Sequence, residues 1–258
     1  MIITFANFKG GVGKTTATSL FAFILSEMKD KKVLVVDTDP QASLTEDLER
    51  TFKVNIDYDK NIFNSIFVNS DISDDIQSLS DNLDILAGSW DLVNFKDNAV
   101  KNFEPEYHSI LLKVLLNGIE EDYDFILIDT APTTDITMDN AVFASDWIII
   151  PTKTERPAFS STEKYYNYLL NLYRNKDTNF ELLGILPYLV GDSATDKRLL
   201  KNYEEFFEGY LFTNSIRQSD RVKTWFDFGI TTNEAHDKNT ISMYEKVVEE
   251  ALNKIKGI

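Results

Sequence analysis

The sequence predicts an α/β fold in which a doubly wound, mostly parallel sheet is flanked by helices. Short apolar runs alternate with amphipathic stretches along the chain, as crossover helices between parallel strands require. A loop rich in glycine and lysine follows the first apolar run, and acidic residues close two later runs. Ligands of such folds bind at the carboxyl ends of the strands, so we expect the functional site there.

The expected strands are nearly all apolar, as in strands that are buried on both faces. They cover Ile2–Ala6, Lys32–Asp37, Leu83–Ala87, Phe125–Asp129, Trp147–Pro151 and Leu182–Tyr188, with a further candidate near Tyr210–Asn214. The expected helices cover Thr15–Met28, Lys113–Glu121, Ser161–Tyr173, Thr195–Phe207 and Ser242–Ile255. The acidic stretch Lys53–Gln77 is predicted to form loops and short helices, because its carboxylates lack the fixed spacing of a calcium loop.

Length and composition limit the classes of protein to consider. The 258 residues contain no linker rich in Pro, Gly or Ser, so we expect one domain over residues 1–258. No apolar run approaches the roughly 20 residues that cross a bilayer, and no secretory leader pattern is evident, so we expect a cytoplasmic protein. The absence of cysteine excludes disulfides and thiolate-bound iron–sulfur clusters. The net charge of −16 means that any contact with DNA must be local.

The loop after the first strand has the composition of a phosphate-binding loop. It reads Lys9-Gly10-Gly11-Val12-Gly13-Lys14-Thr15-Thr16 and precedes a helix-like stretch. In such a loop, backbone N–H groups and a lysine surround nucleotide phosphates, and a Thr hydroxyl ligates Mg²⁺. We therefore expect Lys14 to bind the phosphates and Thr15 to ligate the metal. Phe8 stands where the common pattern has glycine; the alternative, a plain glycine-rich turn, is disfavoured by the position between strand and helix.

Carboxylates follow two of the other predicted strands. Asp37 and Asp39, in the string Asp-Thr-Asp-Pro-Gln, can point the same way before proline turns the chain. Alone, such a pair is also typical of a helix-capping turn. Asp129 closes the later buried run Phe125–Ile128, the position of a magnesium-binding aspartate.

Together these motifs resemble the ParA/MinD group of P-loop ATPases. The loop from Lys9 to Thr16 resembles the deviant Walker A motif of that group, whose early lysine is its signature lysine. The strings around Asp39 and Asp129 are similar to its switch I and switch II. The resemblance covers nearly the whole chain, and it indicates the small form without an N-terminal helix-turn-helix domain.

The resemblance implies ATP and Mg²⁺ as cofactors and a role for each motif residue. It implies that Lys9 reaches across an ATP-dependent homodimer to the partner's nucleotide, with Lys14 and Asp39 as further catalytic residues. Asp39 would orient the attacking water, and Asp37 would support Lys14 or the magnesium shell formed with Thr15 and Asp129. The sequence alone leaves open that Lys9 is an ordinary exposed charge.

Late basic residues are the candidates for DNA contact. Relatives of this type bind DNA without reading its sequence, and here the candidates are Lys197, Arg198, Lys201, Arg217, Arg221 and Lys223. We rank Arg221 first from its place before Phe228 and Gly229, although the Pro-Arg pair of the family is absent. An ordinary solvated surface is the alternative for this cluster.

The leading functional hypothesis is a ParA-type ATPase for plasmid or chromosome partition. It would associate with the nucleoid when ATP-bound and hydrolyse ATP when stimulated by a ParB-like, centromere-binding partner. The alternatives are a MinD-like regulator at the membrane and a small-molecule kinase or synthetase with the same loop. The acidic residues Glu245, Glu249 and Glu250 would face lipid badly, so we expect the last helix to pack on the domain, without stable membrane association.

Overall fold

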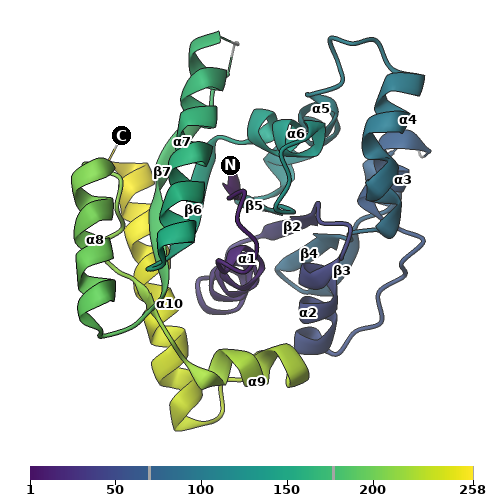
Figure 1. Ribbon diagram of the computed structural model, residues 1–258. Helices are drawn as coiled ribbons and strands as arrows, with labels where there is room; N and C mark the ends of the chain where they lie inside the picture. The colour runs from purple at the N-terminus through teal and green to yellow at the C-terminus, as the bar shows by residue number, and fades with distance from the viewer. Residues whose placement is uncertain (69–70, 176–177, 258) are drawn as a thin grey trace.

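A single mixed sheet forms the centre of the protein. The computed structural model describes residues 1–68, 71–175 and 178–257. Within them, eight strands are ordered β3-β4-β2-β5-β1-β6-β7-β8 (Figure 1). They are β1 (Ile2–Phe5), β2 (Val33–Asp37), β3 (Gln77–Ser80), β4 (Leu83–Leu86), β5 (Phe125–Asp129), β6 (Trp147–Lys153), β7 (Glu181–Val190) and β8 (Ile216–Arg217). Every pairing is parallel except β3 with β4, so the predicted fold class is confirmed.

Helices cover both faces of this sheet. The α-helices are α1 (Lys14–Phe23), α2 (Ser43–Phe52), α3 (Ile62–Phe67), α4 (Phe95–Asn102), α5 (Leu111–Leu116), α6 (Ile136–Ala144), α7 (Arg156–Asn175), α8 (Ala194–Phe206), α9 (Asp220–Phe228) and α10 (Ala235–Lys256). A π-helical turn, η1 (Ile24–Met28), extends α1, and 3-10 turns are η2 (Ile72–Asp74), η3 (Trp90–Asn94) and η4 (Glu120–Asp122). Helices α1, α2 and α10 pack on one side of the sheet, and α6, α7 and α8 lie on the other.

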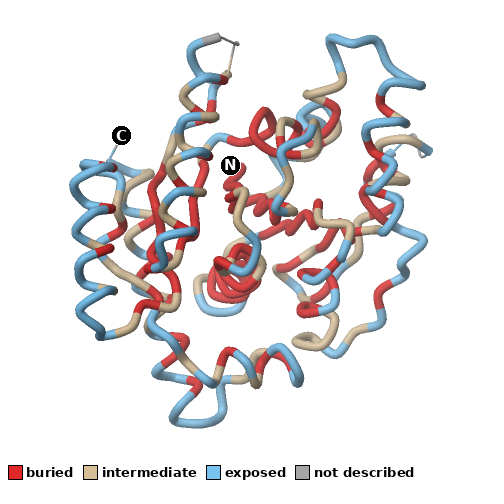
Figure 2. Tube along the Cα trace, viewed as in Figure 1, coloured by how far each residue is buried: buried red, intermediate tan, exposed pale blue. Residues whose placement is uncertain are grey.

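Strand β2 shows why the central runs are apolar at every position. Val33 and Val35 belong to the core beneath α1, whereas Leu34 and Val36 belong to the core on the opposite face. All four side chains are fully buried, because successive residues of a strand point to opposite faces and helices cover both. Figure 2 shows the same buried centre beneath exposed outer helix surfaces.

Several helices and the short edge strand differ most from the prediction. Helices α2, α4, α6 and α9 were not predicted. Helix α5 ends at Leu116 instead of continuing to Glu121, since Asn117 and Gly118 interrupt it. Near Tyr210–Asn214 only Leu211 forms a bridge, to Ile185 of β7. The last strand is instead the two-residue β8. The stretch Lys53–Gln77 forms loops and short helices as predicted, apart from residues 69–70, which lie outside the described residues.

The C-terminal helix packs on the domain as expected. Tyr244, Val247, Val248 and Ala251 of α10 are buried in the core that α1 also lines. Its apolar face is therefore already covered. Among the described residues, no helix combines the length and apolar character needed to cross a membrane.

Register brings the predicted motifs to one edge of the sheet. Strand β5 lies between β2 and β1, and Asp129 pairs with Asp37 on one side and with Phe5 on the other. The loop that follows β1 thus begins at the same level as both carboxylates. Three neighbouring strand ends therefore form the base of the candidate site.

Candidate functional site

The glycine-rich loop connects β1 to α1 through a left-handed turn. Gly13 has φ 96°, and a Cβ atom there would lie 2.4 Å from ring carbons of Tyr188, at the end of β7. Both the backbone conformation and the space exclude other residues. Gly13 is also the N-cap of α1, with no side-chain cap. The first N–H groups of α1 are therefore available to an anion, as in nucleotide-binding loops.

Lys14 is held within the site instead of extending into solvent. Its side chain is buried, and its Nζ donates to the carbonyl oxygen of Lys9 at 3.4 Å. Burial lowers the pKa of Lys14, while the negative charges of Asp129 and Asp39 oppose this shift. The ammonium group is thus fixed inside the curve of the loop.

Thr15 and Asp129 form the most specific contact of the site. The Thr15 hydroxyl donates to Asp129 Oδ2 at 2.6 Å, and Thr18 donates to Oδ1 at 3.4 Å. Asp129 is fully buried, and burial, followed by repulsion from Asp37, raises its pKa to about 8. This buried carboxylate therefore has a strong electrostatic preference for a nearby cation.

Asp37 shapes the chain after β2. Its Oδ2 accepts hydrogen bonds from the Thr45 amide at 3.0 Å and the Thr45 hydroxyl at 2.8 Å, and its Oδ1 accepts from the Asp39 amide at 3.1 Å. Burial raises the pKa of Asp37 to about 6, although these hydrogen bonds act in the opposite direction. Gly88 lies against the same carboxylate, because a Cβ atom there would lie 2.9 Å from Asp37 Cγ. Asp37 thus connects the strand end to α2.

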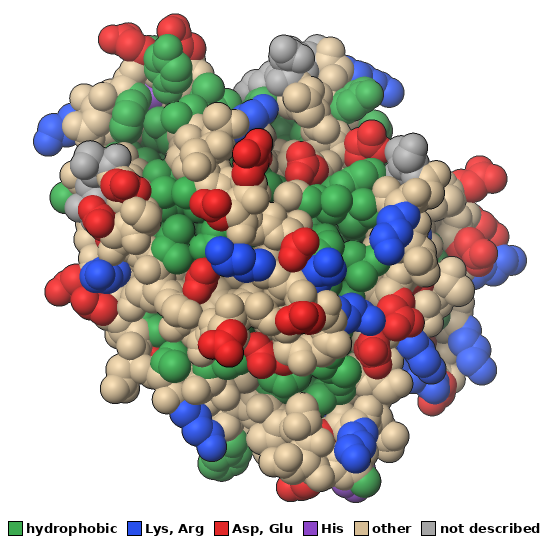
Figure 3. Space-filling view, turned by 180° about the vertical axis from the view of Figure 1, so that it is seen from behind, with side chains coloured by type: hydrophobic (Ala, Val, Ile, Leu, Met, Phe, Trp, Pro, Cys, Tyr) green, Lys and Arg blue, Asp and Glu red, His purple; other side chains and the backbone are tan. Residues whose placement is uncertain are grey.

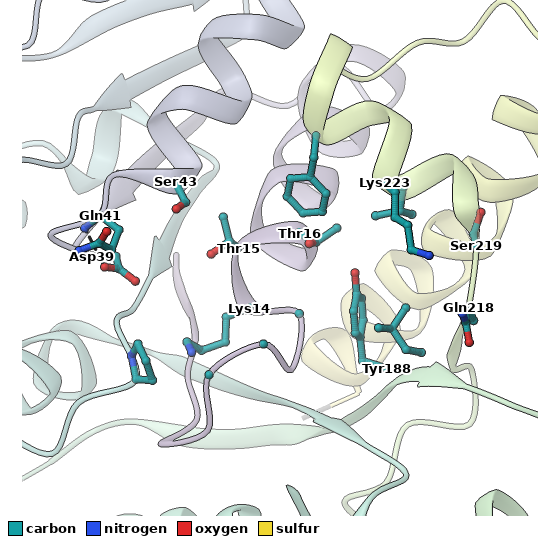
Figure 4. A pocket seen from close by; sticks show the side chains of 17 residues that line it. Lys14, Thr15, Thr16, Asp39, Gln41, Ser43, Tyr188, Gln218, Ser219 and Lys223 are labelled. Carbon is teal, nitrogen blue, oxygen red and sulfur yellow. Dashed lines mark hydrogen bonds between the residues drawn. The ribbon is translucent and has the colours of Figure 1, made fainter.

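Asp39 is the carboxylate that reaches the open part of the site. It is partly exposed, and its Oδ1 accepts a hydrogen bond from the Gln41 amide at 2.9 Å. Its second oxygen remains available to a ligand or water. Figure 4 shows Asp39, Gln41 and Ser43 on one side of a pocket, with Lys14 and Thr15 at its base.

The pocket itself is a cavity of about 530 Å³ between the glycine-rich loop and the late elements. The wall opposite Asp39 includes Tyr188, Gln218, Ser219 and Lys223, which Figure 4 shows across the loop from Gln41. Val222 and Phe226 of α9 complete this wall. The cavity therefore extends from the phosphate-binding loop to a mixed apolar and polar wall, a shape that suits a nucleotide.

The residues present fit a magnesium nucleotide. Glycine amides, Lys14 and the start of α1 suit the phosphates, and the oxygens of Thr15 and Asp129 suit a hard cation. Within the described ranges, no group of three or more His, Cys, Asp or Glu residues could hold a metal alone. A Mg²⁺ ion here would therefore depend on phosphate oxygens and water for its remaining ligands.

Several site residues were not predicted from the sequence. Thr45 supports Asp37, and Tyr188, Gln218 and Phe226 line the cavity. The last three lie more than 170 residues after the loop, so no local spacing connects them with it. For Thr45, the sequence offers only its position five residues after the Asp39-Pro40 pair.

Lys9 lies at the edge of the loop, apart from the cluster around Asp129. It is partly exposed, its amide donates to Asn7 Oδ1 at 3.0 Å, and its carbonyl accepts from Lys14. Both main-chain polar groups of Lys9 thus have partners within the protein. Its side chain is partly exposed and does not line the cavity, in contrast to the buried Lys14.

Most of the late basic residues are paired with acidic neighbours. Four of them have carboxylate partners: Lys201 with Glu205, Arg217 with Asp192, Lys223 with Asp220, and Arg221 with both Glu234 and Asp237. Lys197 and Arg198 are exposed on α8. On the face seen in Figure 3, acidic and basic side chains are interspersed, and no continuous basic surface is visible there.

Comparisons with known proteins identify similar sequences and a similar fold. The profile of the AAA_31 family, described as an AAA domain, matches residues 1–182. The sporulation initiation inhibitor protein Soj of Bacillus subtilis is 26% identical over 226 residues, covering 86% of this chain and 85% of Soj. The virulence plasmid ParA family protein pGP5-D of Chlamydia psittaci is 28% identical, covering 85% and 82%. The crystal structure of a putative plasmid partition protein from Borrelia burgdorferi, bound to AMPPNP, superposes with a TM-score of 0.84 at 29% identity, covering 98% of both chains.

Proposed function

This chain belongs to the ParA family of P-loop ATPases, and we propose that it binds and hydrolyses ATP to partition DNA. The observation that carries the proposal is that Lys14, Thr15 and Asp39 line one cavity, and that Thr15 pairs with the buried Asp129 beneath it. A phosphate-binding lysine, a magnesium-binding pair and a water-orienting carboxylate are the parts that nucleotide hydrolysis requires.

ATP with Mg²⁺ is the proposed ligand. The structure of the Borrelia burgdorferi relative holds AMPPNP, and the loop, Thr15 and Asp129 of this chain suit phosphates and a hard cation. Phosphates would lie on the N-terminus of α1, and the base would lie toward Gln218 and Phe226. The bound ion would neutralise phosphate charge and satisfy the buried Asp129 carboxylate.

Asp39 is the proposed water-orienting residue. It lines the cavity, and one of its carboxylate oxygens is engaged by the Gln41 amide, which fixes the orientation of the group. Asp37 is fully engaged with Thr45 and the Asp39 amide, so its proposed part is to hold Asp39 in place. This division of labour explains why two carboxylates are needed one residue apart.

A second copy of the chain is the proposed binding partner in the ATP state. Lys9 is anchored by its main chain at the edge of the loop, and its side chain would contact the nucleotide of the other copy, as an arginine finger does. Dimerisation would thus depend on ATP.

DNA and a ParB-like protein are the remaining proposed partners. The exposed Lys197 and Arg198 of α8 suit phosphate contacts that do not depend on base sequence. With a net charge of −16, such contacts must be restricted to a small surface. A cytoplasmic protein that associates with the nucleoid in its ATP state follows from this proposal.

Phosphate release measured with and without DNA and ParB-type proteins tests the proposed function. We expect Asp39→Ala to bind ATP and dimerise but hydrolyse it at least about a hundredfold more slowly. Lys14→Ala should lose nucleotide affinity, and Lys9→Ala should bind ATP yet respond poorly to stimulation. Asp59→Ala, an exposed acidic position, serves as the control. Normal turnover by Asp39→Ala would remove that residue from catalysis, and phosphate transfer to a small acceptor would favour a kinase.

A further inference from the structure

Asn7 is a buried polar residue at the point where β1 passes into the glycine-rich loop. Its side chain has no exposed surface. Its Nδ2 donates to the carbonyl oxygen of Pro151 at 2.9 Å and to Thr162 Oγ1 at 3.1 Å. Its Oδ1 accepts from the Lys9 amide at 3.0 Å and from Ser161 Oγ at 3.0 Å. All four hydrogen bonds that an amide group readily makes are therefore formed.

The partners determine the orientation of this amide group. The carbonyl of Pro151 can only accept a hydrogen bond, so Nδ2 must face it. The N–H group of Lys9 can only donate, so Oδ1 must face that side. Turning the amide over would place Oδ1 against the Pro151 carbonyl oxygen and Nδ2 against the Lys9 N–H group, and neither pair could form a hydrogen bond. Asn7 therefore makes one specific connection between the loop, the end of β6 and the first half of α7.

The connection reaches the Lys9 backbone directly. The Lys9 amide is fixed by Asn7, and its carbonyl accepts from Lys14 Nζ. With both polar groups engaged, the direction in which the Lys9 side chain leaves the loop depends on Asn7. The preceding residue strengthens the link to α7, because the Phe8 ring lies 4.9 Å from the Tyr165 ring and 5.3 Å from the Tyr168 ring.

We propose that Asn7 is a positioning residue that aims Lys9 at the nucleotide of a second copy of the chain. The inference rests on the proposed function, in which Lys9 acts across a dimer. Asn7 does not contact the cavity, so it acts through Lys9. Its loss should leave ATP binding by the monomer intact while weakening the ATP-dependent dimer and its turnover.

The buried polar chain continues beyond Asn7. Thr162 Oγ1 pairs with Thr152 Oγ1 at 2.8 Å, and Thr152 Oγ1 pairs with the hydroxyl of Tyr203 at 2.6 Å. Tyr203 belongs to α8, the helix that carries Lys197 and Arg198 on its exposed side. Consecutive hydrogen bonds therefore connect α7 and α8 to the Lys9 backbone, so a movement of either helix would shift that backbone.

A double-mutant cycle between Asn7 and Lys9 tests the proposal. The variants are Asn7→Ala, Lys9→Ala and the double variant, with Thr4→Val as control. Thr4 is a buried polar residue within β1, and its hydroxyl pairs with Ser145 at 2.5 Å, away from the loop. Monomer affinity is measured with a fluorescent ATP analogue, dimerisation by light scattering with AMPPNP, and turnover by phosphate release.

Asn7→Ala should keep ATP affinity within about twofold and reduce dimer affinity and turnover about three- to tenfold, the range of one or two lost hydrogen bonds. The double variant should match Lys9→Ala, because Asn7 acts through that residue. Two outcomes would overturn the inference about Asn7 but leave the proposed function standing. In the first, the effects of the two single variants multiply in the double variant. In the second, Asn7→Ala behaves like the wild type while Lys9→Ala is impaired. If Lys9→Ala dimerises and turns over ATP like the wild type, both the inference and the proposed dimer contact are overturned.

Ser161→Ala keeps the proposal testable if Asn7→Ala does not fold. Ser161 is partly exposed, and its removal takes away one of the two donors to Asn7 Oδ1. We expect a reduction of dimer affinity of about two- to threefold at an unchanged Tm. Unchanged dimerisation and turnover would contradict the role of Asn7.

Discussion

The ring of Tyr188 lies directly against Gly13, at a distance that leaves no space for a side chain at residue 13. The two residues are far apart in the sequence, one in the loop after β1 and the other in β7. Tyr188 in turn accepts a hydrogen bond from the Tyr244 hydroxyl at 3.2 Å. The shape of the phosphate-binding loop is therefore supported by the core beneath it.

Gly13→Ala should abolish nucleotide binding. The substitution combines a positive φ angle with overlap against Tyr188, and these effects together cost roughly 2–5 kcal/mol. Titration with ATP and thermal unfolding check this. Gly118→Ala is the matched control, because nothing lies within 4 Å of the added Cβ atom. Tight ATP binding by Gly13→Ala would mean that the loop adopts another conformation.

Phe226→Ala should weaken binding of the base but not of the phosphates. Phe226 lines the cavity on the wall away from Asp39 and is 38% exposed, so a base can cover its free surface. We expect ATP affinity to fall about 5- to 150-fold, as for loss of one stacking contact, and tripolyphosphate affinity to stay unchanged. Phe228→Ala, on the same helix but 73% exposed and outside the cavity lining, is the control. Equal effects of the two variants would contradict this assignment.

Asp47→Asn should stabilise the protein at alkaline pH. Burial raises the pKa of Asp47 to about 7, despite the attraction of Arg50. The folded state therefore holds a proton that the unfolded chain has lost above about pH 4, and the associated stability disappears as the pH rises through about 7. The gain from Asp47→Asn should grow from pH 5 to pH 8, up to roughly 4 kcal/mol. Denaturant unfolding at both pH values measures it, and a gain that does not depend on pH would contradict the assignment.

Arg221 and Arg198 should differ in what their removal affects. Arg221 pairs with the buried Asp237 and with Glu234, so Arg221→Ala should lower Tm, because a buried carboxylate loses its cation. Arg198 is exposed; Arg198→Ala should leave Tm unchanged and reduce the slope of log affinity for DNA against log salt by about one. Thermal scans and DNA titrations in three salt concentrations separate the two. An unchanged salt slope for Arg198→Ala would remove that residue from the proposed DNA surface.

The parts of the fold that the sequence predicted are those with a strong local signal. Strands β2 and β5 were predicted because every residue of their runs is apolar up to the closing aspartate. Helix α6 was not predicted, because its apolar residues show no helical periodicity and pack into the core on more than one side. Strand β8 has only two residues, too few for any pattern. Its place is set by pairing with β7.

In the candidate site, too, only the residues with a local sequence signal were predicted. Lys14, Thr15 and Asp129 were predicted because each stands in a short motif beside a strand, and register then brings them together. The cavity wall opposite Asp39 was not predicted, because Tyr188 and Phe226 come close to the loop only through tertiary packing. The internal partners of Arg221 were missed for a related reason: Asp237 lies one helix further along the chain.

The central place of β1 in the sheet also determines when the site can form during synthesis. Its neighbours are β5 and β6, which begin at Phe125 and Trp147, so the first strand leaves the ribosome long before either partner. Phe226, which lines the far wall of the cavity, is made about 80 residues after Trp147. The phosphate-binding loop is thus among the first segments made and among the last to be completed. A nascent chain should gain the ability to bind nucleotide only after most of its length has emerged.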